Sequence, residues 1–92
     1  MKYEIRLKNS FKRAFKRCLK RGLDQDLFWT VVNILAETGT LPTKYKPHKL
    51  SGKYEGFWEC HIQPDWLLIW EQHDTELILI LIDTGTHADL FE

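Results

Sequence analysis

The stretch "LILILID", residues 77–83, decides the fold of this chain, because leucine and isoleucine alternate without a polar break up to Asp83. Successive side chains of a strand point to opposite faces, so Leu79 and Leu81 share one face while Ile78 and Ile80 share the other. A strand that is apolar on both faces needs cover on both. We therefore expect a strand covered on one face by helices and on the other by the C-terminal tail or another protein.

The segments next to this stretch predict further strands. Residues 55–62 and 66–72 are rich in the aromatic and β-branched residues that favour strands, and the polar "EQHDTE" at 71–76 makes the turn into 77–83. At the other end of the chain, "YEIRL" at 3–7 alternates like a short first strand.

Two amphipathic helices are predicted between the first strand and the rest. In "SFKRAFKRCLKRG", apolar residues recur at helical spacing, Asn9 or Ser10 can cap the start, and Gly22 suits the end. The second helix runs from Asp24, its expected N-cap, to Glu37, and Gly39 closes it. The order β-α-α-β-β-β predicts an α+β fold, with two N-terminal helices packed on one face of a mainly antiparallel sheet.

Length and composition indicate one globular domain, residues 1–92, with 43% hydrophobic and 28% charged residues. No apolar run approaches the roughly 20 residues that span a bilayer, and the N-terminus lacks the apolar core of a signal peptide. We therefore expect no membrane partner. Cys18 and Cys60 form no C-x-x-C pair, which favours a reducing cytoplasm over a disulfide-stapled secreted protein.

The formal net charge is zero, but the two signs are separated along the chain. All 13 Lys and Arg residues lie within residues 1–53, whereas residues 54–92 hold nine acidic residues and no basic one. The separation predicts either a polyanion-facing side with a second side for another partner, or two halves that neutralise each other in the fold. Part of the basic charge lies in the proline-punctuated loop 40–53, on Lys44, Lys46, Lys49 and Lys53.

Histidines lie where strands are expected to end. If the last three strands are neighbours, the ends at 61–66 and 83–87 share one sheet edge, which brings His61, Asp65 and His87 together, with His48 nearby in the lysine-rich loop. Imidazole titrates near neutral pH, and a carboxylate can fix its tautomer, so such a cluster suits acid–base catalysis.

A cationic loop and aromatic residues beside such a cluster point to RNA as the substrate. The four loop lysines would hold phosphates, Trp66 and Phe91 would stack a splayed base, and two histidines or a His/Asp pair would exchange protons. A metal site is the alternative, although the spacing lacks a short metal-binding motif. Its ligands would be His48, His61, Asp65 and His87.

Three motifs, H-x-L-x-G at 48–52, H-I-x-P-D-W at 61–66 and G-T-H-x-x-L-F at 85–91, resemble a known family. They look like the YafQ branch of the RelE/ParE superfamily of bacterial toxins, and the resemblance extends over essentially the whole chain. It implies a RelE-like fold and a ribosome-dependent endoribonuclease that cuts mRNA in the ribosomal A site, with neither metal nor cofactor.

The resemblance also implies roles for individual residues. His87 is expected to be the general acid, either Asp65 or His61 the general base, and His48 a phosphate contact. Two aromatic residues correspond to positions that shape the site, Trp66 and Phe91.

The chain departs from the resemblance at Trp58 and Asp83, where relatives commonly carry Arg. Arginine at such positions would stabilise charge that builds on the scissile phosphate. Either a loop lysine takes over this role, or this member is slow, altered in substrate or inactive. The alternative function is therefore a RelE/ParE-fold binding protein that acts through an antitoxin or another protein target.

An antitoxin of the DinJ or RelB type is the partner that the resemblance implies, in a hetero-oligomer that would contact DNA only through the antitoxin. The charge separation and the doubly apolar strand 77–83 predict that an acidic antitoxin segment lies along the basic helix 11–21 and covers apolar sheet surface.

Overall fold

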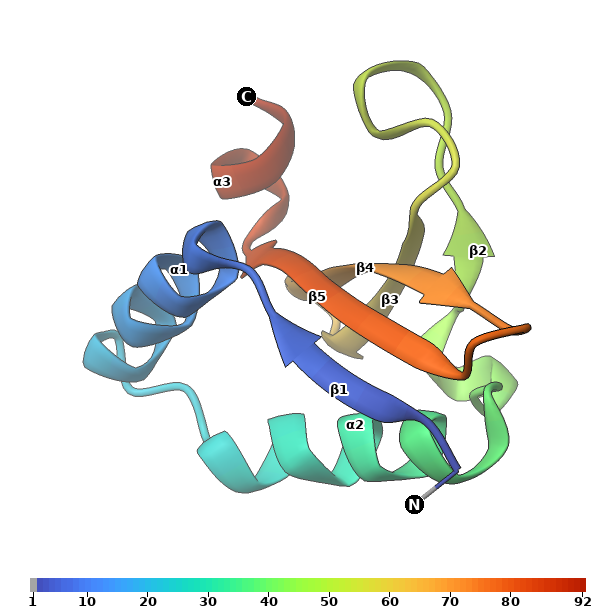
Figure 1. Ribbon diagram of the computed structural model, residues 1–92. Coiled ribbons are helices and arrows are strands. Elements are labelled where there is room, and N and C mark those ends of the chain that lie inside the picture. The colour runs from blue at the N-terminus through green and yellow to red at the C-terminus, as the bar shows by residue number, and fades with distance from the viewer. Residues whose placement is uncertain (1) are drawn as a thin grey trace.

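A five-stranded sheet organises the computed structural model, which describes residues 2–92. The strand order is β1-β5-β4-β3-β2 (Figure 1). Strand β5 (Ile78–Gly85) lies between β1 (Glu4–Leu7), its parallel neighbour, and β4 (Trp66–His73), its antiparallel neighbour. Strands β3 (Trp58–Gln63) and β2 (His48–Lys49) extend the antiparallel part of the sheet.

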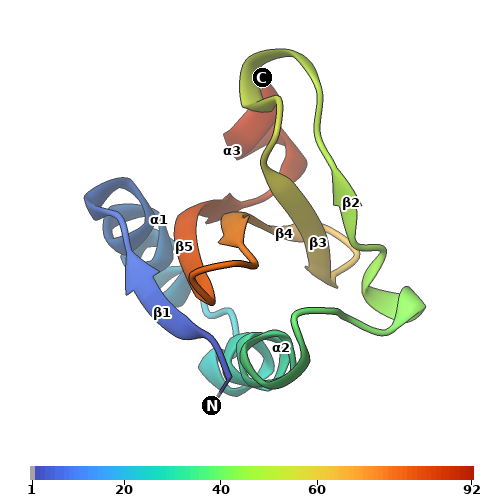
Figure 2. The same ribbon diagram turned by 45° about the vertical axis from the view of Figure 1, so that its right-hand side comes forward.

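Helices lie on both sides of this sheet. Helices α1 (Asn9–Lys20) and α2 (Gln25–Thr38) lie on one side, and α3 (His87–Phe91) lies on the other with the loop between β2 and β3 (Figures 1 and 2). Two short 3-10 helices complete the chain, η1 (Thr43–Tyr45) and η2 (Gly52–Tyr54). The predicted α+β class is confirmed, whereas β2, α3 and the 3-10 helices were not predicted.

The helix ends confirm the predicted cap at Asp24 and the predicted left-handed glycines, Gly22 (φ of 91°) and Gly39, but they contradict the predicted N-cap of the first helix. The Asp24 side chain accepts a hydrogen bond from the Asp26 amide at 2.8 Å, as an N-cap should. Gly39 ends α2 in the left-handed conformation, with φ of 74°. The predicted cap of the first helix was wrong: α1 begins after Lys8 without a side-chain cap, and the Ser10 hydroxyl instead donates to the Ile82 carbonyl.

The main core lies between the sheet and the pair α1 and α2. Leu79 and Leu81 of β5 are completely buried there, together with Phe11 and Phe28 of the two helices. Cys60 belongs to the same core, and its burial raises the pKa of the thiol to about 12. Within residues 2–92, no helix is long and apolar enough to cross a membrane.

A smaller core on the opposite face accounts for the second apolar side of β5. It centres on Leu67, Ile69 and Leu90, and Ile82 packs against it. The C-terminal segment thus covers part of the second face, as predicted, through Leu90 of α3. Nearer the start of β5, the other isoleucines of this face, Ile78 and Ile80, are only half-buried.

A buried hydroxyl joins the start of β4 to the end of β5. The Thr84 hydroxyl donates to the Leu67 carbonyl at 2.6 Å and accepts from the Trp66 indole N–H at 2.9 Å. Thr84 and Trp66 are both buried, so each polar group has its partner inside the protein. Because neither strand can shift without breaking these bonds, they fix the edge at which both strands meet α3.

Replacing Thr84 by valine should destabilise the fold. Valine has a similar shape but leaves the indole N–H and the Leu67 carbonyl without the hydroxyl, at about 1–3 kcal/mol for each buried group that loses its only partner. Urea unfolding should show a lower midpoint for Thr84→Val. Thr84→Ser, which keeps the hydroxyl, should retain most of the stability, and equal losses in both variants would contradict this account.

Candidate functional site

The ends of β3, β4 and β5 meet at one edge of the sheet, as the sequence predicted. His61 is paired with Leu67, and Leu67 with Gly85, which precedes α3 by two residues. Neighbouring strands are roughly 4.8 Å apart, so the Cα atoms of His61 and Gly85 are separated by about 10 Å. A substrate group could therefore lie between the end of β3 and the start of α3.

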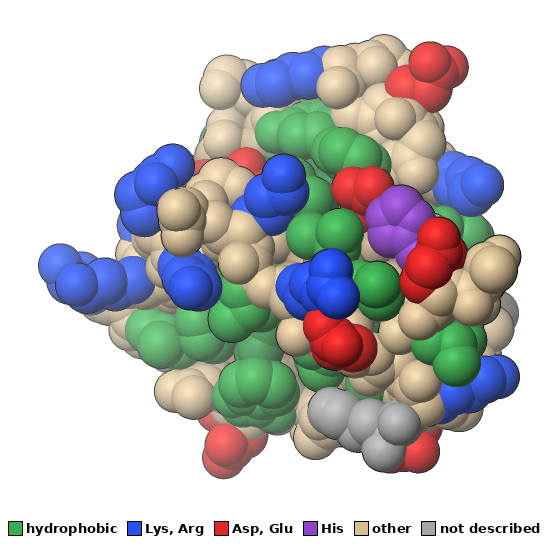
Figure 3. All heavy atoms as spheres, in the orientation of Figure 1, with side chains coloured by type: hydrophobic (Ala, Val, Ile, Leu, Met, Phe, Trp, Pro, Cys, Tyr) green, Lys and Arg blue, Asp and Glu red, His purple; other side chains and the backbone are tan. Residues whose placement is uncertain are grey.

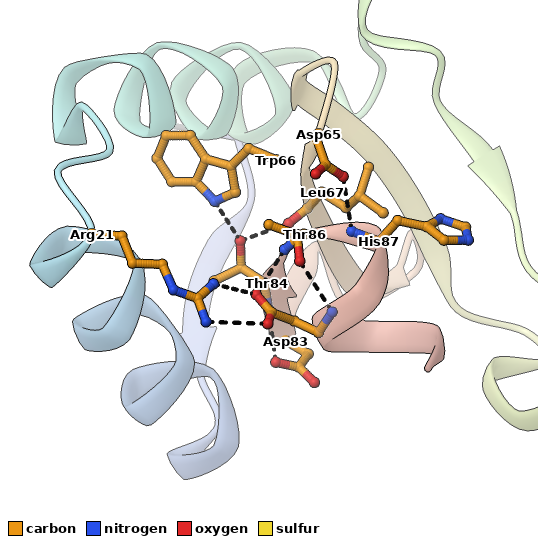
Figure 4. Close-up of polar contacts among 9 residues, drawn as sticks. Arg21, Asp65, Trp66, Leu67, Asp83, Thr84, Thr86 and His87 are labelled. Carbon is orange, nitrogen blue, oxygen red and sulfur yellow. Dashed lines mark hydrogen bonds and ion pairs between the residues drawn. The ribbon is translucent and has the colours of Figure 1, made fainter.

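Asp65 fastens the first turn of α3 to the turn between β3 and β4. One of its carboxylate oxygens accepts the backbone N–H of His87 at 3.0 Å (Figure 4). The His87 imidazole points to the opposite side from Arg21 and Trp66 in this view. Asp65 thus contacts the backbone of His87 rather than its ring, and it leaves the imidazole exposed to solvent.

A second carboxylate, that of Asp89, holds the same helix turn. It accepts the Thr86 backbone N–H while the Thr86 hydroxyl accepts the Asp89 N–H, a reciprocal capping box. The Arg21 guanidinium binds both oxygens of Asp89, at 2.5 and 3.2 Å. The pKa of Asp89 is lowered, first by Arg21 and then by the Thr86 amide.

Gly85 makes this close approach of Asp89 possible. Its φ is 154°, and a Cβ atom at this position would lie 2.7 Å from an oxygen of the Asp89 carboxylate. Any larger residue would therefore push Asp89 away from the helix start.

A buried glutamate lies between two histidines on the α3 side of the sheet. Glu59 is 4% exposed, and its Oε1 atom lies 3.2 Å from His48 Nε2 and 3.9 Å from His61 Nε2. The pairing of β2 with β3 causes this contact, because it sets His48 directly opposite Glu59. The other oxygen, Oε2, is buried without a hydrogen-bond partner among the described residues.

The hydrogen bonds of the two rings define their tautomers. Nδ1 of His48 faces the Lys46 carbonyl at 2.8 Å, and Nδ1 of His61 faces the Pro64 carbonyl at 3.1 Å. A carbonyl only accepts, so Nδ1 carries the proton in both rings. Nε2 of His48 faces the Glu59 carboxylate within hydrogen-bond distance, whereas Nε2 of His61 lies too far from it for a direct bond.

The four predicted phosphate-binding lysines are not gathered at one place. Lys44 and Lys46 line a surface groove of about 470 Å³ that also includes His61. Lys53 lies over the ring of Tyr54, which in turn contacts Phe91 edge-on at 5.7 Å. The remaining loop lysine, Lys49, lies over the ring of Trp58.

The two aromatic residues predicted to contact a base differ in accessibility. Phe91 is 40% exposed, and its ring lies 5.0 Å from that of His87. Trp66 is only 1% exposed and faces the main core, where Thr84 takes its N–H. The prediction that Trp66 stacks a base is therefore wrong for this structure. The Trp66 side chain shapes the site only from the main core, on the other face of the sheet.

The two departures from the arginines of relatives lie on opposite faces of the sheet. Trp58 stacks on Trp70 in the main core at 6.1 Å, away from Glu59 and His61. Asp83 is paired with Ile69, a residue of the smaller core on the α3 side. Partial burial raises the pKa of Asp83. Of the two departures, Asp83 is the one that puts a negative charge on the face that carries the histidines.

The metal alternative finds no grouped ligands. Among residues 2–92, no three or more His, Cys, Asp or Glu side chains converge as a metal site would require. Sequence reasoning also missed two contributors, Glu59 and Arg21. Alternation along β3 already put Glu59 on the face of His61 and could have revealed it, whereas the contact of Arg21 with Asp89 spans 68 residues and left no local signal.

Solved structures of bacterial toxins share this fold. One is the complex of DinJ with YafQ from E. coli, which is 32% identical, with a TM-score of 0.87 and coverage of 98% of this chain and 99% of that one. Another is the metal-bound toxin from Helicobacter pylori, 37% identical, with a TM-score of 0.87 and coverage of 97% and 99%.

The family follows from a match along nearly the whole sequence. The family described as "Bacterial toxin of type II toxin-antitoxin system, YafQ" matches residues 3–92, so this chain belongs to the YafQ toxin family. The mRNA interferase toxin YafQ of Escherichia coli K12 is 41% identical over 58 residues, which cover 63% of this chain and 61% of that protein. The alignment thus spans about three fifths of the length of that relative.

Acid should remove the contribution of Asp89 to stability. The folded-state pKa of Asp89 lies below its ordinary value of 3.8, so the carboxylate stabilises the fold above that value. The stabilisation is lost as the pH falls below about 4 toward the folded-state pKa. The urea midpoint of the wild type should therefore drop more between about pH 6 and about pH 3 than that of Asp89→Asn. Glu76→Gln, an exposed turn variant, should keep the wild-type drop, and an equal drop in Asp89→Asn would refute the assignment.

Proposed function

We propose that this toxin is a ribosome-dependent endoribonuclease that cleaves mRNA in the cytoplasm by acid–base chemistry. The observation that carries the proposal is that His61 of β3 and the start of α3, with His87, lie at one sheet edge, since His61 pairs with Leu67 and Leu67 with Gly85. The basic groove beside His61, with Lys44 and Lys46, suits a phosphate backbone. The name of the E. coli relative, an mRNA interferase, supports RNA as the substrate.

In the proposed reaction, a base removes the proton of a ribose 2′-hydroxyl, whose oxygen attacks the adjacent phosphorus. The bond from phosphorus to the 5′-oxygen breaks, and an acid protonates that oxygen, which leaves a 2′,3′-cyclic phosphate. His61 is the better base, because Pro64 fixes the Nδ1 proton and leaves the Nε2 lone pair. His87, whose ring is exposed beside Phe91, is the acid.

The remaining residues of the site support these two. Glu59 lies close enough to stabilise the imidazolium that His61 becomes when it takes the proton. His48 contacts the buried carboxylate through Nε2 and serves as a phosphate contact. Asp65 holds the backbone of His87, and Phe91 offers an exposed face for a splayed base.

Removing either imidazole should abolish most of the cleavage. His61→Ala and His87→Ala should each lower the rate roughly 10²–10⁴-fold, the usual worth of a general acid or base. The measurement is the mapping of mRNA 5′ ends in a translating extract, with protein purified through EDTA and added to buffer whose Mg²⁺ keeps ribosomes intact. His73→Ala removes a histidine that pairs with Glu71 at 2.8 Å, at the other end of β4, and should cleave like the wild type.

Two outcomes would count against the proposal. Wild-type rates in both histidine variants would show that the site is wrong. Growth arrest by the wild type without any new mRNA 5′ ends would favour the alternative, a binding protein on the same fold. The position of Asp83 favours this alternative, because its carboxylate lies on the face of the sheet that carries the histidines, where relatives commonly carry Arg.

We also propose that an acidic segment of an antitoxin neutralises the toxin by binding along α1. Exposed basic side chains gather over this helix, at the left of Figure 3, and residues 9–20 contain no acidic residue. The half-buried Ile78 and Ile80 of β5 offer apolar surface on the same molecule. The E. coli relative was crystallised with DinJ, which supports a partner of this kind.

Co-expression with the product of the neighbouring gene should give a stable complex. Charge reversal of three exposed residues of α1, Lys12→Glu, Lys16→Glu and Lys20→Glu, should weaken it, and the loss should be smaller at high salt, where the wild-type attraction is also screened. Binding can be measured by titration calorimetry with the triple variant and the wild type. Equal affinity of the two would place the antitoxin elsewhere.

A further inference from the structure

We propose that Arg21 is a positioning residue for RNA cleavage: by holding Asp89, it fixes the helix turn that presents His87. The inference rests on the proposed function, because it assigns a role to a residue remote from the substrate. No motif of the sequence points to Arg21, which follows the last residue of α1.

Arg21, at the end of α1, contacts Asp89 of α3. The Arg21 guanidinium forms two parallel bonds with the Asp89 carboxylate, at 2.5 and 3.2 Å (Figure 4). Such a bidentate pair fixes direction as well as distance, which a lysine ammonium cannot do. The Arg21 side chain is 43% exposed and that of Asp89 only 18%, so the carboxylate is the more enclosed partner.

Asp89 in turn holds the backbone next to His87. The Asp89 oxygen that lies nearer to Arg21 also accepts the Thr86 N–H at 2.9 Å. The next backbone N–H, that of His87, is taken by Asp65 at 3.0 Å. Two successive amides at the start of α3 are thus held by two carboxylates, and only the carboxylate of Asp89 is held in turn from another helix.

Helix α3 is too short to be stable by itself. A helix of five residues is far below the length at which isolated helices persist, so its direction depends on outside contacts. Leu90 is its only buried residue. The apolar anchor alone would leave the helix free to pivot, and two polar contacts oppose this pivot at the end that carries His87: the bond to Asp65 and the pair of Arg21 with Asp89.

The test uses Arg21→Gln, Asp89→Asn and the double variant. A displacement of about 1 Å can cost 10²-fold in rate, so each single variant should lower kcat at least roughly tenfold, with KM within about twofold of the wild type. Because both residues act through one contact, the double variant should be no slower than the worse single variant. Arg21→Lys keeps the charge but loses the bidentate geometry, and its kcat should lie between wild type and Arg21→Gln.

Arg6→Gln is the matched control. Arg6 is also an exposed arginine in an ion pair, with Glu4 on β1, and its loss should leave kcat unchanged. Unchanged kcat in Arg21→Gln, fully additive losses in the double variant, or a rise of KM alone would each overturn the proposal. The last result would make Arg21 a substrate-binding group instead.

Hydrogen exchange separates this proposal from the proposed function. Exchange of the Thr86 and His87 amides, measured by NMR without RNA, should be at least roughly tenfold faster in Arg21→Gln than in the wild type, while amides of β4 keep their rates. If the wild type cleaves no RNA but these amides respond, the proposed function fails, while the fixing of the helix turn by Arg21 stands. If cleavage is normal and the amides of Arg21→Gln exchange as in the wild type, the positioning role fails alone.

Discussion

The hydroxyl of Thr84 is the contact on which the rest of this structure depends. It joins the beginning of β4 to the end of β5 by accepting from Trp66 and donating to Leu67. Asp65 lies immediately before this junction and Gly85 immediately after it, so the junction determines where both point. The chemistry at the sheet edge therefore depends on a polar contact that is itself completely buried.

The site is held by contacts between a carboxylate and a partner, and the contacts of Asp65 and Asp89 join residues that are distant in sequence. Asp65 holds the backbone of His87, Glu59 lies between His48 and His61, and Asp89 receives Arg21. Residues 54–92, the acidic part of the chain, thus supply the three carboxylates of these contacts. Of the two readings of the charge separation, mutual neutralisation holds at Arg21, and an exposed basic face remains along α1.

Alternation and helical spacing were enough to predict four of the strands and the two long helices, because the burial of apolar faces determines both patterns. They put Leu79 and Leu81 in the core and the histidines at one edge. They could not predict that Trp66 faces inward, since a register shift between His61 and Gln63 decides which face follows the turn. Nor could they predict α3, whose five residues hold their shape through Arg21 and Asp65 rather than through helix propensity.

Leu90 gives α3 a second role, because it covers apolar surface of the sheet. It is 3% exposed against Leu67 and Ile69, so a ligand that lifts α3 uncovers all three at a cost of about 25 cal/mol per Å² of apolar area. An inhibitor that works by displacement must therefore bring an apolar side chain for the place that Leu90 leaves. An inhibitor that only competes for Arg21 needs no such anchor, because it loosens the turn of His87 while the cover stays in place.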